Sequence, residues 1–182
     1  MTEMIRILFV CQKNVTLSPM AVQIFSNMLR KKKISNHFKV DSAAVLDDAK
    51  IGLPMDDGAK NILSRAGIAT GNHTSVRLTA DVAEKYDWIV CMTEFGRRKC
   101  FDIFKGSAVY VTPADVKRVF KTDPASPISL DGMIKPRICC LMDFTGFSRD
   151  VMDPETTGDY RMAFNELTLG CSSLLALSSF GN

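Results

Sequence analysis

A cysteine at the end of an apolar segment is the residue of this chain with the clearest chemical potential. Cys11 closes the run IRILFVC at residues 5–11, whose apolar, β-branched composition predicts a buried strand. A short polar loop follows, and Ser18-Pro19 predicts a helix start with Ser18 as its N-cap. The N–H groups of such a loop and helix end converge on one spot, which favours an anion and lowers the pKa of a thiol there. Cys11 is therefore a candidate thiolate nucleophile, with an inert core thiol as the alternative.

The elements that would position this cysteine alternate between strands and helices. Such alternation is typical of an α/β protein whose parallel sheet is covered on both faces. We expect a three-layer sandwich with a central four-stranded parallel sheet flanked by helices. The expected strands are residues 5–11, 38–42, 88–92 and 137–142. The expected helices are residues 18–32, 56–66, a short helix after Thr79, 94–104 and 160–177.

The length of 182 residues and the hydrophobic content of 46% predict a single domain with a full core, spanning residues 1–182. The stretch 106–136 is the least regular part, with four prolines among Ser and Asp. We expect it to be an irregular insertion in this domain rather than a second domain.

Composition excludes several classes of function. A net charge of +3 is too small to indicate nucleic acid or a membrane surface as a partner. No apolar run approaches the ~18 residues of a membrane span, and the N-terminus lacks the features of a secretory signal. The chain has two histidines and no CxxC or HExxH motif, so we expect no metal site. It also lacks the glycine-rich fingerprints of nucleotide-binding proteins, so we expect no cofactor. Six cysteines, three of them inside apolar runs, favour free thiols in the cytoplasm.

The run VCQKNVTLSPMA resembles the phosphate-binding loop of the low-molecular-weight protein tyrosine phosphatases. That family's motif is Cys, five residues, Arg, then Ser or Thr. Five further stretches resemble family segments in the same order: VDSA, LPMDDGAKNILSRAGI, HTSVRLT, YDWIVCMTE, and Asp153-Pro154 followed by Gly158. The resemblance covers nearly the whole chain, with 106–136 longer than in the family.

The resemblance implies a two-step hydrolysis of phosphotyrosine through a phosphocysteine. By position, Cys11 is the nucleophile and Asp153 the general acid and base, although an Asp-Pro turn is an alternative use of Asp153. Ser42 and His73 take supporting roles, and for His73 a hydrogen bond that only holds the shape of the loop is an alternative. The phosphate loop comprises Gln12, Lys13, Asn14, Val15, Thr16, Leu17 and Ser18, of which Asn14 and Ser18 would hold the loop and tune the thiolate.

The chain departs from the family at Leu17, where the family has the arginine that donates a fork of hydrogen bonds to the phosphoryl group. Leucine offers no donor and no charge. Losing one preorganised donor typically costs about 10²–10³ in rate. Without the neighbouring cation, we also expect a higher pKa for Cys11 than in the active enzymes.

Other departures affect the same surface. Lys13 replaces the loop glycine and is a candidate for restoring a positive charge, although a flexible ammonium does not copy the planar fork. Thr16 replaces a second loop cysteine. Asp47-Asp48 and Glu155-Thr156 replace the expected aromatic residues, so we expect a phosphotyrosine ring to lose stacking surfaces and to meet negative charge.

Three hypotheses follow. The first is a phosphatase-like protein with impaired or absent activity that binds phosphotyrosine proteins or another protein partner. The second is an active, cysteine-dependent protein tyrosine phosphatase in which Lys13, or less directly Arg77 or Arg149, replaces the missing arginine. The third is a thiol redox protein of the arsenate reductase type; the pair Cys139-Cys140 bears on it, but adjacent residues of a strand face opposite ways.

Overall fold

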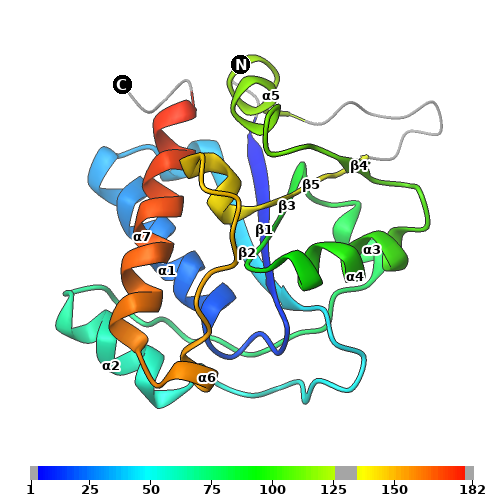
Figure 1. The fold of residues 1–182 in the computed structure, drawn as a ribbon. Helices are drawn as coiled ribbons and strands as arrows, with labels where there is room; N and C mark the ends of the chain where they lie inside the picture. Colours follow the sequence, from blue (N-terminus) through cyan, green and yellow to red (C-terminus); the bar gives the residue numbers. More distant parts are fainter. Residues whose placement is uncertain (1–3, 126–134, 179–182) are drawn as a thin grey trace.

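A five-stranded parallel sheet forms the centre of the computed structural model, which describes residues 4–125 and 135–178 (Figure 1). The strand order is β2-β1-β3-β5-β4. The strands are β1 (Ile5–Cys11), β2 (Phe38–Ala44), β3 (Trp88–Cys91), β4 (Val109–Tyr110) and β5 (Arg137–Cys140). The expected α/β class and parallel sheet are confirmed, but the expectation of four strands is wrong. The additional strand β4 has only two residues, both exposed, so it carries no apolar run that sequence could reveal.

Helices cover both faces of the sheet, which confirms the three layers. One face packs against α1 (Leu17–Lys32), α2 (Asp57–Arg65), α5 (Val116–Thr122) and α7 (Tyr160–Leu177). The other face packs against α3 (Ala80–Ala83) and α4 (Glu94–Phe104), which lie on the opposite side of the sheet in Figure 1. The remaining elements are α6 (Pro154–Thr157) and the 3-10 helices η1 (Ser35–His37) and η2 (Leu141–Thr145).

The stretch expected to be an irregular insertion contains β4 and α5 in its described part. Phe120 of α5 packs on Trp88 with ring centroids 5.2 Å apart, and the Trp88 indole N–H donates to the Pro124 carbonyl at 2.7 Å. Arg137 of β5 donates to the carbonyls of Asp123 and Ala125 at 2.8 and 2.7 Å. These contacts tie residues 109–125 to the core. The rest of the stretch, residues 126–134, lies outside the described residues.

The parallel sheet places the carboxyl ends of neighbouring strands at one edge, where ligand sites of such folds form. Cys11 ends β1, and Thr93 follows β3 at the same edge. Helix α1 begins at Leu17, so Ser18 is not the N-cap that its type suggests; Thr16 occupies that position. Ser18 lies in the first turn, fully buried, where its hydroxyl is available for the loop.

Helix length and the state of the cysteines bear on the classes of function considered from composition. In the described ranges 4–125 and 135–178, no helix combines the length and apolar character needed to cross a membrane. All six cysteines are free and buried, including the three that lie inside apolar runs.

Candidate functional site

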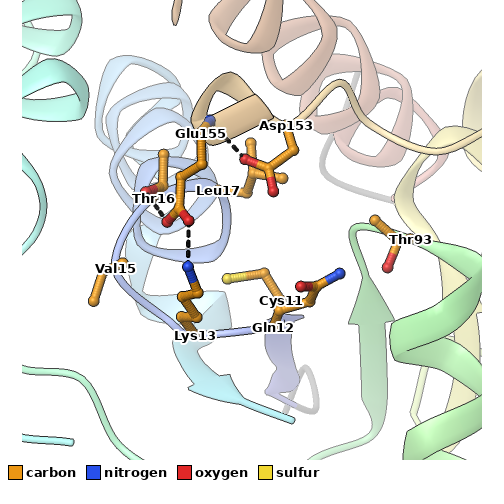
Figure 2. A pocket seen from close by; sticks show the side chains of 9 residues that line it. All are labelled: Cys11, Gln12, Lys13, Val15, Thr16, Leu17, Thr93, Asp153 and Glu155. Atoms are coloured by element: carbon orange, nitrogen blue, oxygen red, sulfur yellow. Dashed lines mark hydrogen bonds and ion pairs between the residues drawn. The ribbon is translucent and has the colours of Figure 1, made fainter. Parts of the chain in front are cut away.

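The loop between β1 and α1 curls around the Cys11 sulfur at the carboxyl edge of the sheet (Figure 2). The sulfur accepts a hydrogen bond from the Asn14 N–H at 3.3 Å and lies 2.9 Å from the Ser18 hydroxyl. Asn14 adopts a left-handed conformation with φ of 59°, which asparagine tolerates better than most residues. This backbone turn brings the Asn14 N–H back onto the sulfur.

Asn14 is fully buried and connects the loop to the surrounding chain. Its side-chain amide donates to the hydroxyls of Ser18 at 2.9 Å and Ser42 at 2.8 Å, and its side-chain oxygen accepts the Val76 N–H at 3.0 Å. The His73 ring N–H donates to the Asn14 carbonyl at 2.7 Å. Ser42 and His73 therefore lie where the resemblance places supporting residues, and both act on Asn14 rather than on the thiol.

This network fixes the direction of the hydrogen bond to the thiol. The Val76 N–H must meet the oxygen of the Asn14 side chain, so the amide nitrogen faces Ser18. Because that nitrogen can only donate, Ser18 accepts there and keeps its own proton for the Cys11 sulfur. The arrangement stabilises a thiolate through donors without a formal charge.

Burial nevertheless dominates the protonation of Cys11. The residue is 7% exposed, and its burial raises the pKa of the thiol above the usual value. The Ser18 hydroxyl and the main-chain N–H groups of Ser18, Asn14 and Lys13 lower that pKa without reversing its direction. The direction agrees with what is expected when the loop has no neighbouring arginine.

We predict slow, strongly pH-dependent alkylation of Cys11. Because the thiolate is the nucleophile, the rate with iodoacetamide should rise about tenfold per pH unit up to at least pH 9. Mass spectrometry of the peptide that contains Cys11 measures the rate. Cys11→Ala is the control, because any labelling that remains in this variant comes from the other cysteines. Rapid labelling at pH 6 with little dependence on pH would contradict the raised pKa.

The cavity over Cys11 is small. It measures about 30 Å³, room for very few water molecules. Leu17 forms part of its wall, is 4% exposed and also packs in the core cluster, so the position to which the resemblance assigns an arginine is apolar here. The lining residues are Cys11, Gln12, Lys13, Val15, Thr16, Leu17, Thr93, Asp153 and Glu155.

The one lysine in this lining is already paired. Lys13 Nζ lies 2.5 Å from a carboxylate oxygen of Glu155, and this contact raises the pKa of Lys13. The other Glu155 oxygen lies 3.5 Å from the Thr16 hydroxyl, which also donates to Asp56 (Figure 2 draws the Glu155 contacts). Lys13 therefore lies at the loop, but its ammonium group forms an ion pair with a carboxylate of the same chain.

Asp153 lies both at the start of a helix and at the wall of the cavity. Its carboxylate caps α6 by accepting the Glu155 N–H at 2.9 Å, and the same residue lines the cavity with Cys11. An Asp-Pro helix start and a carboxylate near the sulfur are therefore compatible. Asp153 and Cys11, 142 positions apart in the chain, meet because η2 and the segment after it return to the carboxyl edge of the sheet.

The other residues considered for the site lie elsewhere. Arg77 donates to the Ala49 carbonyl, and Arg149 pairs with Glu166; neither lines the cavity. Asp47 and Asp48 are exposed and also stand outside it, so the negative charge at the mouth comes from Glu155 and Asp153 instead.

The cysteine pair considered for redox chemistry lies in the core of the protein. Cys139 and Cys140 belong to core clusters on opposite faces of the sheet, as adjacent strand residues should. Within residues 4–125 and 135–178, no three His, Cys, Asp or Glu side chains gather as metal ligands would.

Sequence reasoning missed three contributors: Thr93, Asp56 and the Val76 N–H. Thr93 carried a usable signal, because it directly follows a predicted buried strand at the edge where sites form. Asp56 was recognised only as a helix start. The Val76 N–H carries no side-chain signal at all.

Comparison with known proteins places these features in context. The sequence model of the family described as low molecular weight phosphotyrosine protein phosphatase matches residues 6–115. The chain is 27% identical over 173 residues to the low molecular weight protein-tyrosine-phosphatase YfkJ of Bacillus subtilis, covering 95% of each chain. Its fold matches the crystal structure of YfkJ with a TM-score of 0.74, over 96% of this chain and 94% of the other. It is 34% identical over 96 residues to the low molecular weight phosphotyrosine protein phosphatase of Gallus gallus, 53% of this chain and 60% of that protein.

Proposed function

The chain belongs to the low molecular weight phosphotyrosine protein phosphatase family, and from this premise we propose that its phosphatase activity is impaired or absent and that it acts by binding. The observation that carries the proposal is Leu17, an aliphatic wall at the position of the arginine fork. Charge develops on the phosphoryl oxygens during transfer, and catalysis depends on preorganised cations and donors aimed at them. Here the loop offers neutral donors, because its one lysine is paired with Glu155.

The charges around the cavity support the same proposal. Asp153 and Glu155 line the cavity, while its one lysine is bound to Glu155. A phosphoester dianion would meet two carboxylates and no free cation among the lining residues. Repulsion of the dianion and the missing fork both weaken ground-state binding, and the missing fork further raises the barrier to transfer.

Turnover of p-nitrophenyl phosphate tests the proposal. We expect the purified wild-type protein and Cys11→Ala to release nitrophenol at the same background rate, with YfkJ as the positive control. A wild-type rate that Cys11→Ala abolishes would contradict impaired chemistry.

An active cysteine-dependent phosphatase is the second candidate. The intact network of Cys11, Asn14 and Ser18 favours it, as does Asp153 in the same cavity. In that case Lys13 must leave Glu155 to contact the phosphoryl group, so Lys13→Ala should abolish the turnover that Cys11→Ala abolishes. Turnover that survives Lys13→Ala would exclude this use of the lysine.

We propose further that the protein works in the cytoplasm, bound to a phosphotyrosine protein or another protein partner. Six free, buried thiols support a reducing compartment, because cysteines of secreted domains are commonly paired.

A further inference from the structure

A second, larger hollow adjoins the phosphate loop. It measures about 340 Å³, within the range of pockets that hold ligands, whereas the cavity over Cys11 measures about 30 Å³. We call it the side groove. Its apolar surface comes from the loop and from the segment after β2. The lining residues are Lys13, Val15, Leu46, Asp48, Ala49, Lys50 and Leu53.

The side groove is held in place by hydrogen bonds to rigid parts of the fold. The Leu46 N–H donates to the Gln12 carbonyl at 3.1 Å, which ties the groove to the loop. The Leu53 N–H donates to the Ser75 hydroxyl at 3.0 Å, and Arg77 donates to the Ala49 carbonyl at 2.9 Å. A ligand would therefore meet a preformed surface, which reduces the ordering cost of binding.

Two lysines border this apolar surface. Lys13 lines both the side groove and the cavity over Cys11, so it connects the two hollows. Lys50 is exposed, and no carboxylate of the described residues forms an ion pair with it. Asp48 is the one acid of the lining. The groove therefore combines an aliphatic floor with ammonium groups at its border. This combination suits a ligand that has an aliphatic side chain flanked by two carboxylates.

The loop already holds one carboxylate, that of Glu155. This group lies between Lys13 and Thr16 at the mouth of the cavity (Figure 2). A carboxylate carries a single negative charge, so beside Asp153 it meets less repulsion than a phosphate dianion would. The Lys13 ammonium at this loop therefore already pairs with a carboxylate.

Resting on the proposed function, we propose that the binding partner is a protein with an acidic, aliphatic segment. One carboxylate of that segment replaces Glu155 on Lys13. A neighbouring leucine-sized side chain fills the side groove, and a second carboxylate reaches Lys50. The ligand of this phosphatase-like site is then a carboxylate rather than a phosphate ester.

Titration of the full ¹⁵N-labelled chain tests this inference. The probe is the peptide Ac-Glu-Leu-Glu-NH₂, and the controls are Ac-Gln-Leu-Gln-NH₂ and inorganic phosphate. We expect the acidic peptide to shift the amide signals of Lys13, Val15, Leu46 and Lys50 at concentrations where neither control does. Equal shifts with the glutamine peptide, or stronger binding of phosphate, would overturn the carboxylate assignment.

Charge-neutralising variants locate the contacts. Glu155→Gln removes the internal competitor and should tighten the acidic peptide about two- to five-fold, the range expected for one exposed ion pair. Lys50→Gln should weaken it by about the same factor. Lys121→Gln, an exposed lysine of α5 outside the groove, is the matched control and should change nothing. An unchanged affinity in Glu155→Gln would contradict replacement of Glu155.

The outcome is separable from that of the proposed function. Wild-type turnover of p-nitrophenyl phosphate that needs Cys11 contradicts impaired chemistry, whatever the peptide does. Absent turnover combined with absent peptide shifts leaves the proposed function standing and rejects the acidic segment as ligand.

Discussion

Leu17→Arg is expected to raise the turnover of p-nitrophenyl phosphate by about 10²–10³-fold over the wild-type protein. Leu17 is the first residue of α1 and lines the cavity over Cys11, so a guanidinium placed there faces the position of a phosphoryl group. The methylene stem of arginine can cover the apolar wall that Leu17 now forms while its head extends into the cavity. A cation beside the sulfur should also lower the pKa of Cys11 and speed its alkylation at neutral pH.

The acid at the mouth limits this gain. Glu155 lines the same cavity, so we expect its carboxylate to pair with a new guanidinium in competition with phosphate. The double variant Leu17→Arg/Glu155→Gln should therefore turn over faster than Leu17→Arg alone. Leu17→Lys separates charge from geometry, because it brings an ammonium without the planar fork. Leu17→Met, similar in volume and uncharged, is the control for packing.

A folded Leu17→Arg protein without turnover would have a definite meaning. It would show that the proposed impairment involves more than Leu17, for example the acids at the mouth of the cavity or Lys13. Circular dichroism would exclude a failure to fold as the reason. Equal activity in Leu17→Arg and Leu17→Met would contradict the role given to the guanidinium.

The long elements of the fold were predictable because several local signals agree on them. Helices α4 and α7 span residues 94–104 and 160–177, the ranges expected from their apolar periodicity. Strand β4 was not predictable, because two exposed residues carry neither an apolar run nor alternation. It forms by parallel pairing with the edge of β5, and such pairing depends on tertiary contacts rather than on local sequence.

The residues of the candidate site were predicted from the resemblance, and their chemical roles stay predictions. The resemblance predicted that Cys11 and Asp153 belong to one site, and both line the same cavity. It did not reveal that Lys13 forms an ion pair with Glu155. Ser18 has the residue type of an N-cap, and that interpretation was wrong because its hydroxyl is held by Asn14 and directed at the sulfur. A side-chain preference predicts a local partner, and it fails where a buried polar network supplies a better one.

That network underlies the largest stability effect that we expect, the loss caused by Asn14→Ala. The substitution removes three side-chain hydrogen bonds of the buried Asn14, to Ser18, Ser42 and the Val76 N–H. The bond to the buried Ser18 is fully enclosed and the other two are partly buried, so we expect the loss of this network to cost about 1–3 kcal/mol. Alanine must also adopt the left-handed conformation at φ of 59°, at a cost of about 1–2 kcal/mol. Together we expect a loss of about 2–5 kcal/mol in the free energy of unfolding, measured by urea denaturation.

Asn14→Gly separates the two causes, because glycine adopts positive φ without strain and also lacks the amide. If both contribute, Asn14→Gly should unfold at a urea concentration between those of Asn14→Ala and the wild-type protein. Equal losses in the two variants would assign the whole effect to the side-chain network. A midpoint for Asn14→Ala equal to that of the wild-type protein would contradict the central role given to Asn14, since the loop would then keep its shape around the Cys11 sulfur through main-chain contacts alone.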